Sequence, residues 1–301
     1  MRTAVGVICS LALLCLLWGC SSGQATEQKN QTGSAETASA EPKAADHRIV
    51  ATTVAITEIM DALGVELIGI PTSSKELPER YAGVTEVGNP MNPNMEIIKG
   101  LAPTEVLSVT TLQYDLKPVF ANAGIEAKFI DLTSLERMEQ AILDLGEQYD
   151  RQKAAGGLVA SVDDKLKEIQ AEVADRPAPT VLILLGVPGS YLVATEHSYI
   201  GDLVARLGGK NIVQGEEVEY LASNTEYLQQ ANPDIILRAA HGMPDEVVEM
   251  FNEEFQTNTV WKHFSAVQNG RVYDLEERLF GTTGNLAAAE ALEELKAMMY
   301  P

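Results

Sequence analysis

Two segments of the chain follow one template, and this internal repeat constrains the fold more than any other feature of the sequence. The copies occupy residues 94–107 and 224–237. Each reads Asn, any residue, Glu, a short amphipathic run, Pro, two spacers and an apolar pair, which predicts a helix, a break and a strand. Echoes flank both copies in the same order: Leu63-Gly64 and Leu207-Gly208 before them, Asp131-Leu132 and Asp274-Leu275 after them. The repeat predicts two similar α/β lobes with one cleft between them.

A long amphipathic helix is expected between the two lobes. Apolar residues recur there at spacings of three and four, namely Leu158, Val162, Leu166, Ile169 and Val173, and a continuous helix over 151–175 would span about 35 Å. Strands alternate with helices on either side, which favours parallel sheets. We therefore expect an α/β fold of two Rossmann-like lobes, 48–150 and 177–301, joined by one connecting helix at 151–176.

Local patterns place the individual elements. Strands are expected at 49–51, 67–70, 128–130 and 181–185, and helices at 54–63, 115–122 and 134–149. Thr52 and Thr53 are suited to cap the first helix. Two polar, Pro-containing loops, 71–75 and 88–93, are expected at an edge or a mouth of the first lobe.

The N-terminus has the pattern of an export signal. Arg2 precedes an apolar run that ends in Leu17-Trp18-Gly19-Cys20, and this run is shorter than the roughly 20 residues that span a bilayer. The segment 1–19 is thus predicted to be a lipoprotein signal peptide, since its end resembles a bacterial lipobox in which Cys20 is lipidated. Residues 20–47 are expected to form a flexible tether, because 21–46 contain no large apolar side chain.

Composition and missing motifs exclude several function classes. The formal charge of −21 repels nucleic acid and anionic lipid, so the lipid anchor is the expected membrane contact. The chain has no phosphate-binding loop, no G-x-S-x-G elbow and no H-E-x-x-H zinc motif. Cys9 and Cys15 lie in the segment that would be removed, so no disulfide is expected.

Five segments together carry a family resemblance: 52–55, 88–91, 182–195, 238–244 and 261–264. Through them the chain resembles the substrate-binding lipoproteins of ABC importers whose lobes are joined by one long helix (class III). Among these it is most similar to the haem-receptor lipoproteins of the iron-regulated surface determinant system of Gram-positive bacteria. The resemblance implies a receptor on the extracellular face of the cytoplasmic membrane. It would accept haem, iron protoporphyrin IX, from cell-wall haem-transfer proteins and deliver it to an ABC permease, without enzyme activity.

The resemblance implies that Met91 and His241 are the two axial ligands of the haem iron. The local chemistry agrees, because Pro90 and Pro93 restrain the loop of Met91. His241 follows a predicted strand, and ligands of open α/β sheets collect at the carboxyl ends of strands. Without the resemblance, Met91 would be read as a core residue and His241 equally well as a surface loop residue.

Further residues are candidates for contacts to the haem propionates. Thr53, Val54 and Ala55 begin a helix whose free N–H groups can bind a carboxylate, and Ser73 and Lys75 offer a hydroxyl and a cation. Their alternative roles are an ordinary helix cap and a solvated loop. Two nearby thioethers are expected to pack instead, Met95 in its helix and Met243 in its loop.

The repeated glutamates, Glu96 and Glu226, occupy equivalent positions near the start of a helix, where a carboxylate favours the helix dipole. The resemblance adds a second role, in which one glutamate from each lobe docks onto basic residues of the permease.

Two other functions are compatible with a similar scaffold. A siderophore- or corrinoid-binding protein would need a cleft rich in Arg or aromatic residues. An exported haem-modifying enzyme would need an open coordination position or a paired acid and base. Ligation by Met and His fills both axial positions of haem iron, which favours carriage over catalysis.

Overall fold

The computed structural model describes residues 47–223, 228 and 232–301, which belong to one compact unit, Asp46–Pro301. The predicted signal peptide, Cys20, nearly all of the predicted tether and Glu226 lie outside the described residues. No helix among the described residues is long and apolar enough to span a membrane.

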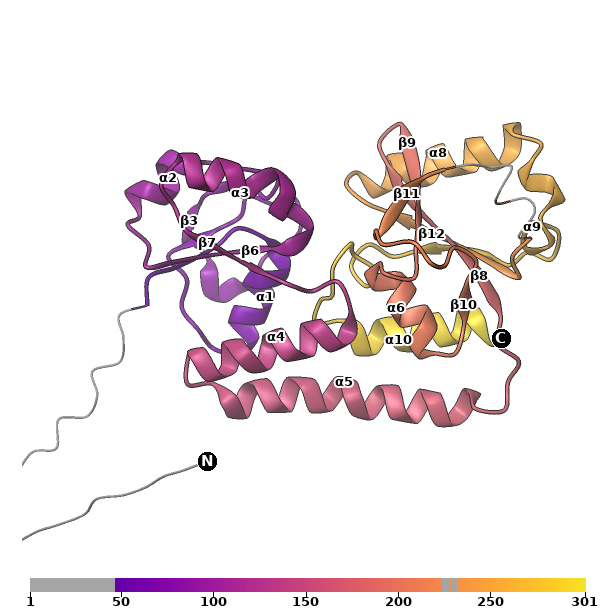
Figure 1. Cartoon of the computed structure of the whole chain (residues 1–301), viewed down its shortest axis with the longest axis horizontal. Helices are drawn as coiled ribbons and strands as arrows, with labels where there is room; N and C mark the ends of the chain where they lie inside the picture. The colour runs from indigo at the N-terminus through magenta and orange to yellow at the C-terminus, as the bar shows by residue number, and fades with distance from the viewer. Residues whose placement is uncertain (1–46, 224–227, 229–231) are drawn as a thin grey trace, which may run out of the picture. The chain divides into compact units, whose positions relative to one another are not determined.

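The first sheet is parallel throughout, as predicted. Its described strands pair in the order β3-β2-β1-β6-β7 (Figure 1). They are β1 (Ile49–Ala51), β2 (Gly69–Ile70), β3 (Thr85–Glu86), β6 (Glu105–Val109) and β7 (Ala127–Ile130). A separate hairpin of β4 (Gly88–Asn89) and β5 (Asn92–Pro93) follows β3.

Helices cover both faces of this sheet because its strands are apolar on both sides. Val50 and Val106 pack on one face together with α2 and α3. Their chain neighbours Ile49 and Leu107 pack on the other face with α1 and α4, as the alternation of side chains along a strand requires. The helices are α1 (Val54–Ala62), α2 (Met95–Gly100), α3 (Gln113–Asn122) and α4 (Leu135–Gln148).

The second sheet is mixed, whereas parallel sheets were expected in both lobes. Parallel pairing joins β8 (Thr180–Val187) to β10 (Lys210–Asn211) and β12 (Ile235–Ala240), and β12 to β13 (Val272–Leu275). The antiparallel strands are β9 (Ser190–Ala194) and β11 (Tyr220–Ala222). The cause is the turn at Pro188-Gly189, where Gly189 has a φ of 80° and the chain reverses into a hairpin.

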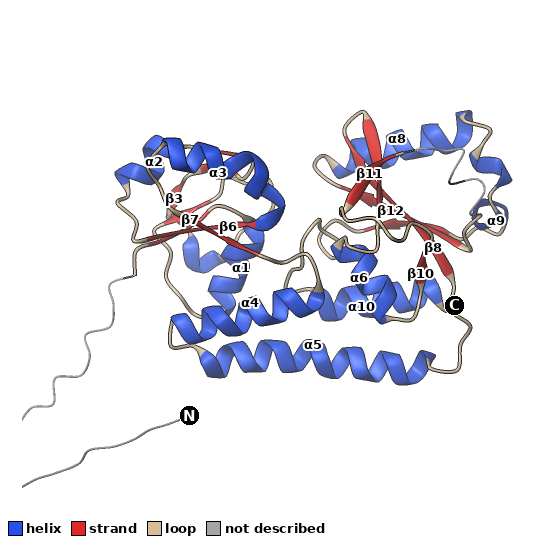
Figure 2. Ribbon diagram, in the orientation of Figure 1, coloured by secondary structure: helices blue, strands red, loops and turns tan. Residues whose placement is uncertain are grey.

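Helices also lie on both faces of the second sheet (Figure 2). The helix α8 packs on one face, and α6 and α10 pack on the other. The helices are α6 (Tyr199–Arg206), α8 (Pro244–Thr257), α9 (Ser265–Gln268) and α10 (Ala288–Met299). Short 3-10 turns lie at Glu79–Tyr81, Thr110–Leu112 and Trp261–His263.

The predicted connecting helix is confirmed as α5 (Gln152–Val173), which packs against α4 of the first lobe and α10 of the second (Figure 1). Val162, Leu166 and Ile169 are buried in this contact, as their spacing predicted. Twenty-two residues correspond to about 33 Å of helix. Lys165 adds an ion pair across the contact, with Nζ 3.0 Å from Glu293 Oε1 on α10.

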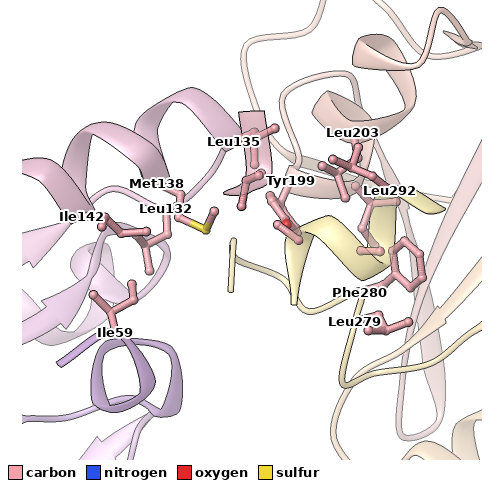
Figure 3. Packing of buried hydrophobic residues seen from close by; sticks show 14 of the residues in the cluster. Ile59, Leu132, Leu135, Met138, Ile142, Tyr199, Leu203, Leu279, Phe280 and Leu292 are labelled. Carbon is pink, nitrogen blue, oxygen red and sulfur yellow. The ribbon is translucent and has the colours of Figure 1, made fainter. Parts of the chain in front are cut away.

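One apolar cluster continues from the first lobe into the second (Figure 3). Leu135 and Met138 of α4 belong to the same cluster as Tyr199 of α6 and Leu292 of α10. The backbone N–H of Leu135 also donates to Asp202 Oδ2 at 2.8 Å. The lobes therefore share a core, which favours a rigid arrangement over free hinge motion.

The internal repeat is visible in the backbone contacts. In the first copy the N–H of Thr104 donates to the carbonyl of Arg48 at 2.9 Å, and in the second the N–H of Asp234 donates to Thr180 at 3.0 Å. The echoed glycines also match, since Gly64 and Gly208 both have positive φ, at 69° and 82°. Each follows the first helix of its lobe, α1 or α6.

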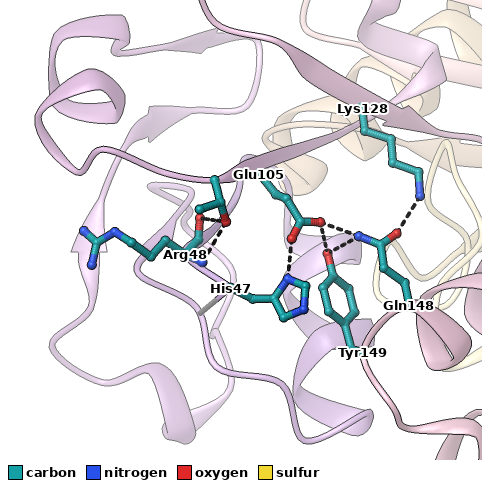
Figure 4. Close-up of polar contacts among 7 residues, drawn as sticks. His47, Arg48, Glu105, Lys128, Gln148 and Tyr149 are labelled. Atoms are coloured by element: carbon teal, nitrogen blue, oxygen red, sulfur yellow. Dashed lines mark hydrogen bonds and ion pairs between the residues drawn. The ribbon is translucent and has the colours of Figure 1, made fainter. Parts of the chain in front are cut away.

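The chain enters the first lobe at the amino edge of its sheet (Figure 4). His47 Nδ1 lies 2.6 Å from Glu105 Oε1, at the start of β6, so this residue, expected to end the tether, is held by the folded lobe. The hydroxyl of Tyr149 donates to the other oxygen of Glu105 at 2.7 Å, and burial followed by that hydrogen bond raises the Tyr149 pKa. Gln148 donates to the same carboxylate and accepts from Lys128.

Candidate functional site

The candidate residues of the first lobe lie at one edge of its sheet. Thr53 follows β1, Ser73 and Lys75 follow β2, and Met91 follows β3. These three strands are parallel neighbours, so their carboxyl ends meet at the same edge. Ligands of such sheets bind at that edge.

Met91 lies at the turn between β4 and β5, and its side chain reaches solvent. It is 70% exposed, which argues against the alternative role of a core residue. Its backbone N–H donates to Asn89 Oδ1 at 2.9 Å, and the carbonyl of Gly88 accepts from Thr72 N at 2.9 Å. The hairpin therefore presents a thioether from a restrained turn that is tied to the loop of Ser73.

The helix α1 begins with unpaired donors. Thr53 is its N-cap, and Thr53 Oγ1 accepts from Ile56 N at 3.5 Å. The N–H groups of Val54 and Ala55 make no hydrogen bond to any residue that the structure describes, as expected for the first turn of a helix. These two donors can bind an anion.

The loop after β2 has a partly committed hydroxyl and an exposed cation. Ser73 Oγ accepts from the backbone N–H of Lys75 at 2.9 Å, which shapes the loop. The Lys75 side chain is 43% exposed, and its Nζ lies 3.4 Å from Glu277 Oε1. That contact links the candidate residues of the first lobe to the second lobe.

His241 directly follows β12, at the carboxyl edge of the second sheet. Its N–H donates to the carbonyl of Gly186 on β8 at 2.9 Å, which fixes the backbone at this position. The side chain is 43% exposed, although Nδ1 is buried. The exposed part of the ring therefore belongs to its other atoms, and Met91 and His241 together offer a thioether and an imidazole, both suitable ligands for haem iron.

Glu277 is a site residue that sequence reasoning missed. It lies two residues after β13, its side chain is 13% exposed, and its Oε1 lies 3.4 Å from His241 Nδ1. Oε1 also accepts from Gly242 N at 3.3 Å. The sequence contained one signal for this residue. Glu277 comes just after Asp274-Leu275, which matches Asp131-Leu132 of the first lobe and marks the carboxyl end of a strand.

The other methionines differ in burial. Met95 packs against the core on the α2 side, as predicted. The prediction that Met243 packs in its loop is wrong, since its side chain is 55% exposed. Met243 is the N-cap of α8, with a left-handed φ of 55°, and so it precedes the helical turns whose residues Val247 and Phe251 are buried.

The docking and lipidation candidates are only partly described. Glu96 is exposed in the first turn of α2, where Asn94 Oδ1 accepts from Glu96 N at 3.1 Å. In the first copy of the template, the Asn thus caps the helix. Glu226 and Cys20 lie outside the described residues.

A model of the family described as periplasmic binding protein matches residues 49–279. The chain is 47% identical over 263 residues to the high-affinity heme uptake system protein IsdE of Staphylococcus aureus strain Newman, covering 86% of this chain and 89% of the relative.

Two solved structures have the same fold. The crystal structure of S. aureus IsdE complexed with heme matches with a TM-score of 0.82 and 47% identity, over 85% of this chain and 100% of that chain. An ABC transporter substrate-binding protein from Listeria monocytogenes EGD-e matches with a TM-score of 0.80 and 59% identity, over 84% of this chain and 98% of that one.

Proposed function

The chain belongs to the periplasmic binding protein family, and from this premise we propose that it binds haem between its two lobes and delivers it to an ABC permease. The observation that carries the proposal is the pair of accessible ligand atoms at the carboxyl edges of the two sheets. Met91, a residue that is 70% exposed, contributes a thioether, and His241, whose side chain is 43% exposed, contributes an imidazole. Its relatives are transport proteins, so the chain carries cargo and catalyses no reaction.

Axial ligation by Met91 and His241 suits a carrier. Met and His fill both axial positions of haem iron and leave no vacant position for oxygen or peroxide. One ligand comes from each lobe, so the bound haem bridges the lobes. Because the lobes already share a core, loss of either ligand weakens haem retention without unfolding the protein.

The haem propionates lie, in this proposal, against the first lobe. Val54 N–H and Ala55 N–H donate to one carboxylate at the start of α1, next to Thr53, the N-cap residue. Lys75 supplies a positive charge, and Ser73 Oγ offers a donor while it continues to accept from Lys75 N. These contacts explain why a chain with a formal charge of −21 binds a dianionic porphyrin, since local donors act at shorter range than the overall field.

The permease contacts are proposed for the repeated glutamates. Glu96 is exposed on α2, and Glu226 holds the equivalent position of the second template. A carboxylate on each lobe gives two separate points of attachment for basic residues. Transport by E96A and E226A, with haem binding measured in parallel, tests this role, and loss of haem binding would contradict it.

The membrane anchor is proposed to be a lipidated Cys20, exposed after removal of 1–19 and followed by a tether. The folded lobe receives this tether at the amino edge of the first sheet, where His47 contacts Glu105. The proposed haem ligands lie at the carboxyl edges. In this proposal the receptor is anchored on the extracellular face of the membrane. Its haem site lies at the opposite edge of the first sheet from the point where the tether joins the lobe.

The experiment that tests haem ligation is a haemin titration of the purified domain followed by absorption spectroscopy. We expect a low-spin, six-coordinate spectrum for the natural protein, and high-spin or five-coordinate spectra for M91A and H241A. M243A is the matched control, because it removes the thioether of a residue that is 55% exposed and lies two positions from His241. Unchanged low-spin spectra in both ligand variants would exclude the assignment.

A further inference from the structure

Glu277 differs from the charged residues around it. It belongs to the run Glu276-Glu277-Arg278, in which Glu276 is exposed and pairs with Arg278 at 2.9 Å. The Glu277 side chain is only 13% exposed. A carboxylate that loses water needs charged or hydrogen-bonding partners in return.

Three groups provide that compensation. Oε1 of Glu277 lies 3.4 Å from His241 Nδ1 and 3.4 Å from Lys75 Nζ, and it accepts from Gly242 N at 3.3 Å. Lys75 contributes a positive charge and Gly242 an N–H donor to the same oxygen, so the charged form of the Glu277 carboxylate is compensated for its burial. Glu277 thus contacts one candidate haem residue from each lobe, Lys75 from the first and His241 from the second.

The contact with His241 is made at one defined ring nitrogen. Nδ1 is buried without a hydrogen-bond partner among the described residues and faces the Glu277 carboxylate at 3.4 Å, so a proton on Nδ1 is favoured in the neutral ring. The lone pair then resides on Nε2. At 3.4 Å the contact is longer than a well-formed hydrogen bond, as is common in ligand-free sites whose contacts tighten when the ligand binds.

We propose that Glu277 is the positioning residue of the haem site, which holds the proton on Nδ1 of His241 and thereby presents Nε2 to the iron. This inference rests on the proposed haem-binding function. A carboxylate behind a ligating histidine fixes the orientation of the ring and makes it a stronger electron donor. Glu277 therefore favours ferric over ferrous haem and slows haem loss.

The competing role is purely structural, in which Glu277 only ties the lobes together through Lys75. The two roles differ in measurable ways. If Glu277 has only the structural role, its removal alters stability and leaves the His241 tautomer and the haem reduction potential unchanged. If Glu277 is the positioning residue, its removal changes both the tautomer and the potential.

The test compares E277A and E277Q with E276A, the control that removes a carboxylate from the adjacent, exposed position. The nitrogen chemical shifts of the His241 ring, measured by NMR on the haem-free protein at alkaline pH, report the tautomer. In the natural protein and in E276A we expect the proton on Nδ1, and in E277A a mixture with the proton moved largely to Nε2. E277Q keeps an acceptor for Nδ1, so we expect it to retain the tautomer.

With haem bound, we expect the reduction potential of E277A to shift to more positive values and haem dissociation to accelerate by about tenfold. E277Q removes the charge but keeps the acceptor, so it should shift the potential in the same direction by less. If E277A does not fold, the haem reduction potential of E277Q tests the proposal by itself. An unchanged tautomer in E277A, or an unchanged potential in both Glu277 variants, would overturn the proposal. Failure of the natural protein to bind haem would refute the proposed function instead, and the NMR result on haem-free protein distinguishes the two.

Discussion

Ala102 and Asn232 occupy the same position in the two copies of the repeated template, and both have a left-handed backbone, with φ of 46° and 39°. Each immediately precedes the proline that separates the template's helix from its strand. The repeat is thus a repeat of backbone conformation as well as of residue type. The two residues differ in how well they suit it, because Asn tolerates the left-handed region better than Ala does.

Ala102→Gly is expected to stabilise the protein. Release from the left-handed region is worth about 1 kcal/mol for Ala, and the larger entropy of Gly in the unfolded chain offsets about half of that gain. The free energy of unfolding, measured by urea denaturation, should rise by about 0.5 kcal/mol.

Asn232→Gly is the matched comparison and should act in the opposite direction. Asn232 Oδ1 accepts from Ser265 N at 2.9 Å at the start of α9. Loss of that hydrogen bond costs about 1 kcal/mol, while little strain is relieved. Equal effects of the two substitutions would contradict this account of the repeat.

Gly186→Ala should destabilise the second lobe and disturb His241. A Cβ at residue 186 would lie 2.6 Å from Phe251 Cε2 and closer still to Val247 Cγ1. Such overpacking costs about 1–3 kcal/mol, and the carbonyl of Gly186 also holds His241 N at 2.9 Å. Thermal unfolding measures the cost, and the haem spectrum measures the effect on the ligand.

Gly156→Ala, on α5, tests whether close packing is the cause of the destabilisation expected for Gly186→Ala. No described atom outside its own helix and chain neighbours lies within 4 Å of a Cβ placed there, so the change should gain up to about 1 kcal/mol of helix propensity. A loss of stability in both variants would point away from packing at Gly186.

Sequence patterns predicted the main elements of the fold because they report local and repeated physics. The spacing of Val162, Leu166 and Ile169 predicted α5, and the repeated template predicted that β6 and β12 hold equivalent positions. The hairpin that presents Met91 was not predicted, because β4 and β5 contain two residues each and carry no periodicity. The antiparallel β9 was missed for a different reason. It was not among the strands expected from the sequence, because Pro188-Gly189 marks a turn without showing that a strand follows it.

Glu277 shows why the site was only partly predictable. Glu277 lies between Glu276 and Arg278, and such a run of charged residues is typical of a solvent-exposed segment. Its burial depends on contacts with Lys75 and His241, which are distant in the sequence. Local pattern does not encode such contacts. The family resemblance supplied Met91 and His241 as ligands but not the carboxylate that contacts one of them.

Glu219→Gln should stabilise the protein near neutral pH and have little effect in acid. Burial, followed by the charge of Asp131, raises the pKa of Glu219. A carboxyl with a raised pKa in the folded state contributes stability below its unfolded pKa, and that contribution is lost as pH rises through the folded pKa. Gln mimics the protonated form, so the variant should be more stable by about 0.5 kcal/mol at neutral pH, after allowance for partial exposure.

Chemical denaturation of the natural protein and E219Q on both sides of the Glu219 titration checks the sign. Glu216→Gln is the control, because Glu216 precedes Glu219 in the same segment and is exposed. A stability difference for E219Q that grows toward acid would show that the burial argument is wrong.

Lys75→Ala is expected to accelerate haem dissociation by about tenfold, or about 1.4 kcal/mol, because the proposed propionate contact loses its cation. Lys75 Nζ lies 3.4 Å from Glu277 Oε1, so in haem-free protein this cation is partly neutralised and a propionate must compete for it. Stopped-flow transfer of haem to an excess of apomyoglobin measures the rate. Higher salt should accelerate release from the natural protein more than from K75A, since screening acts on the charge that the variant lacks. Lys99→Ala removes the same charge from the exposed last turn of α2 and should leave the rate unchanged. If K75A releases haem no faster than K99A, Lys75 serves only its ion pair with Glu277, and the propionates are held by the N–H groups of Val54 and Ala55 alone.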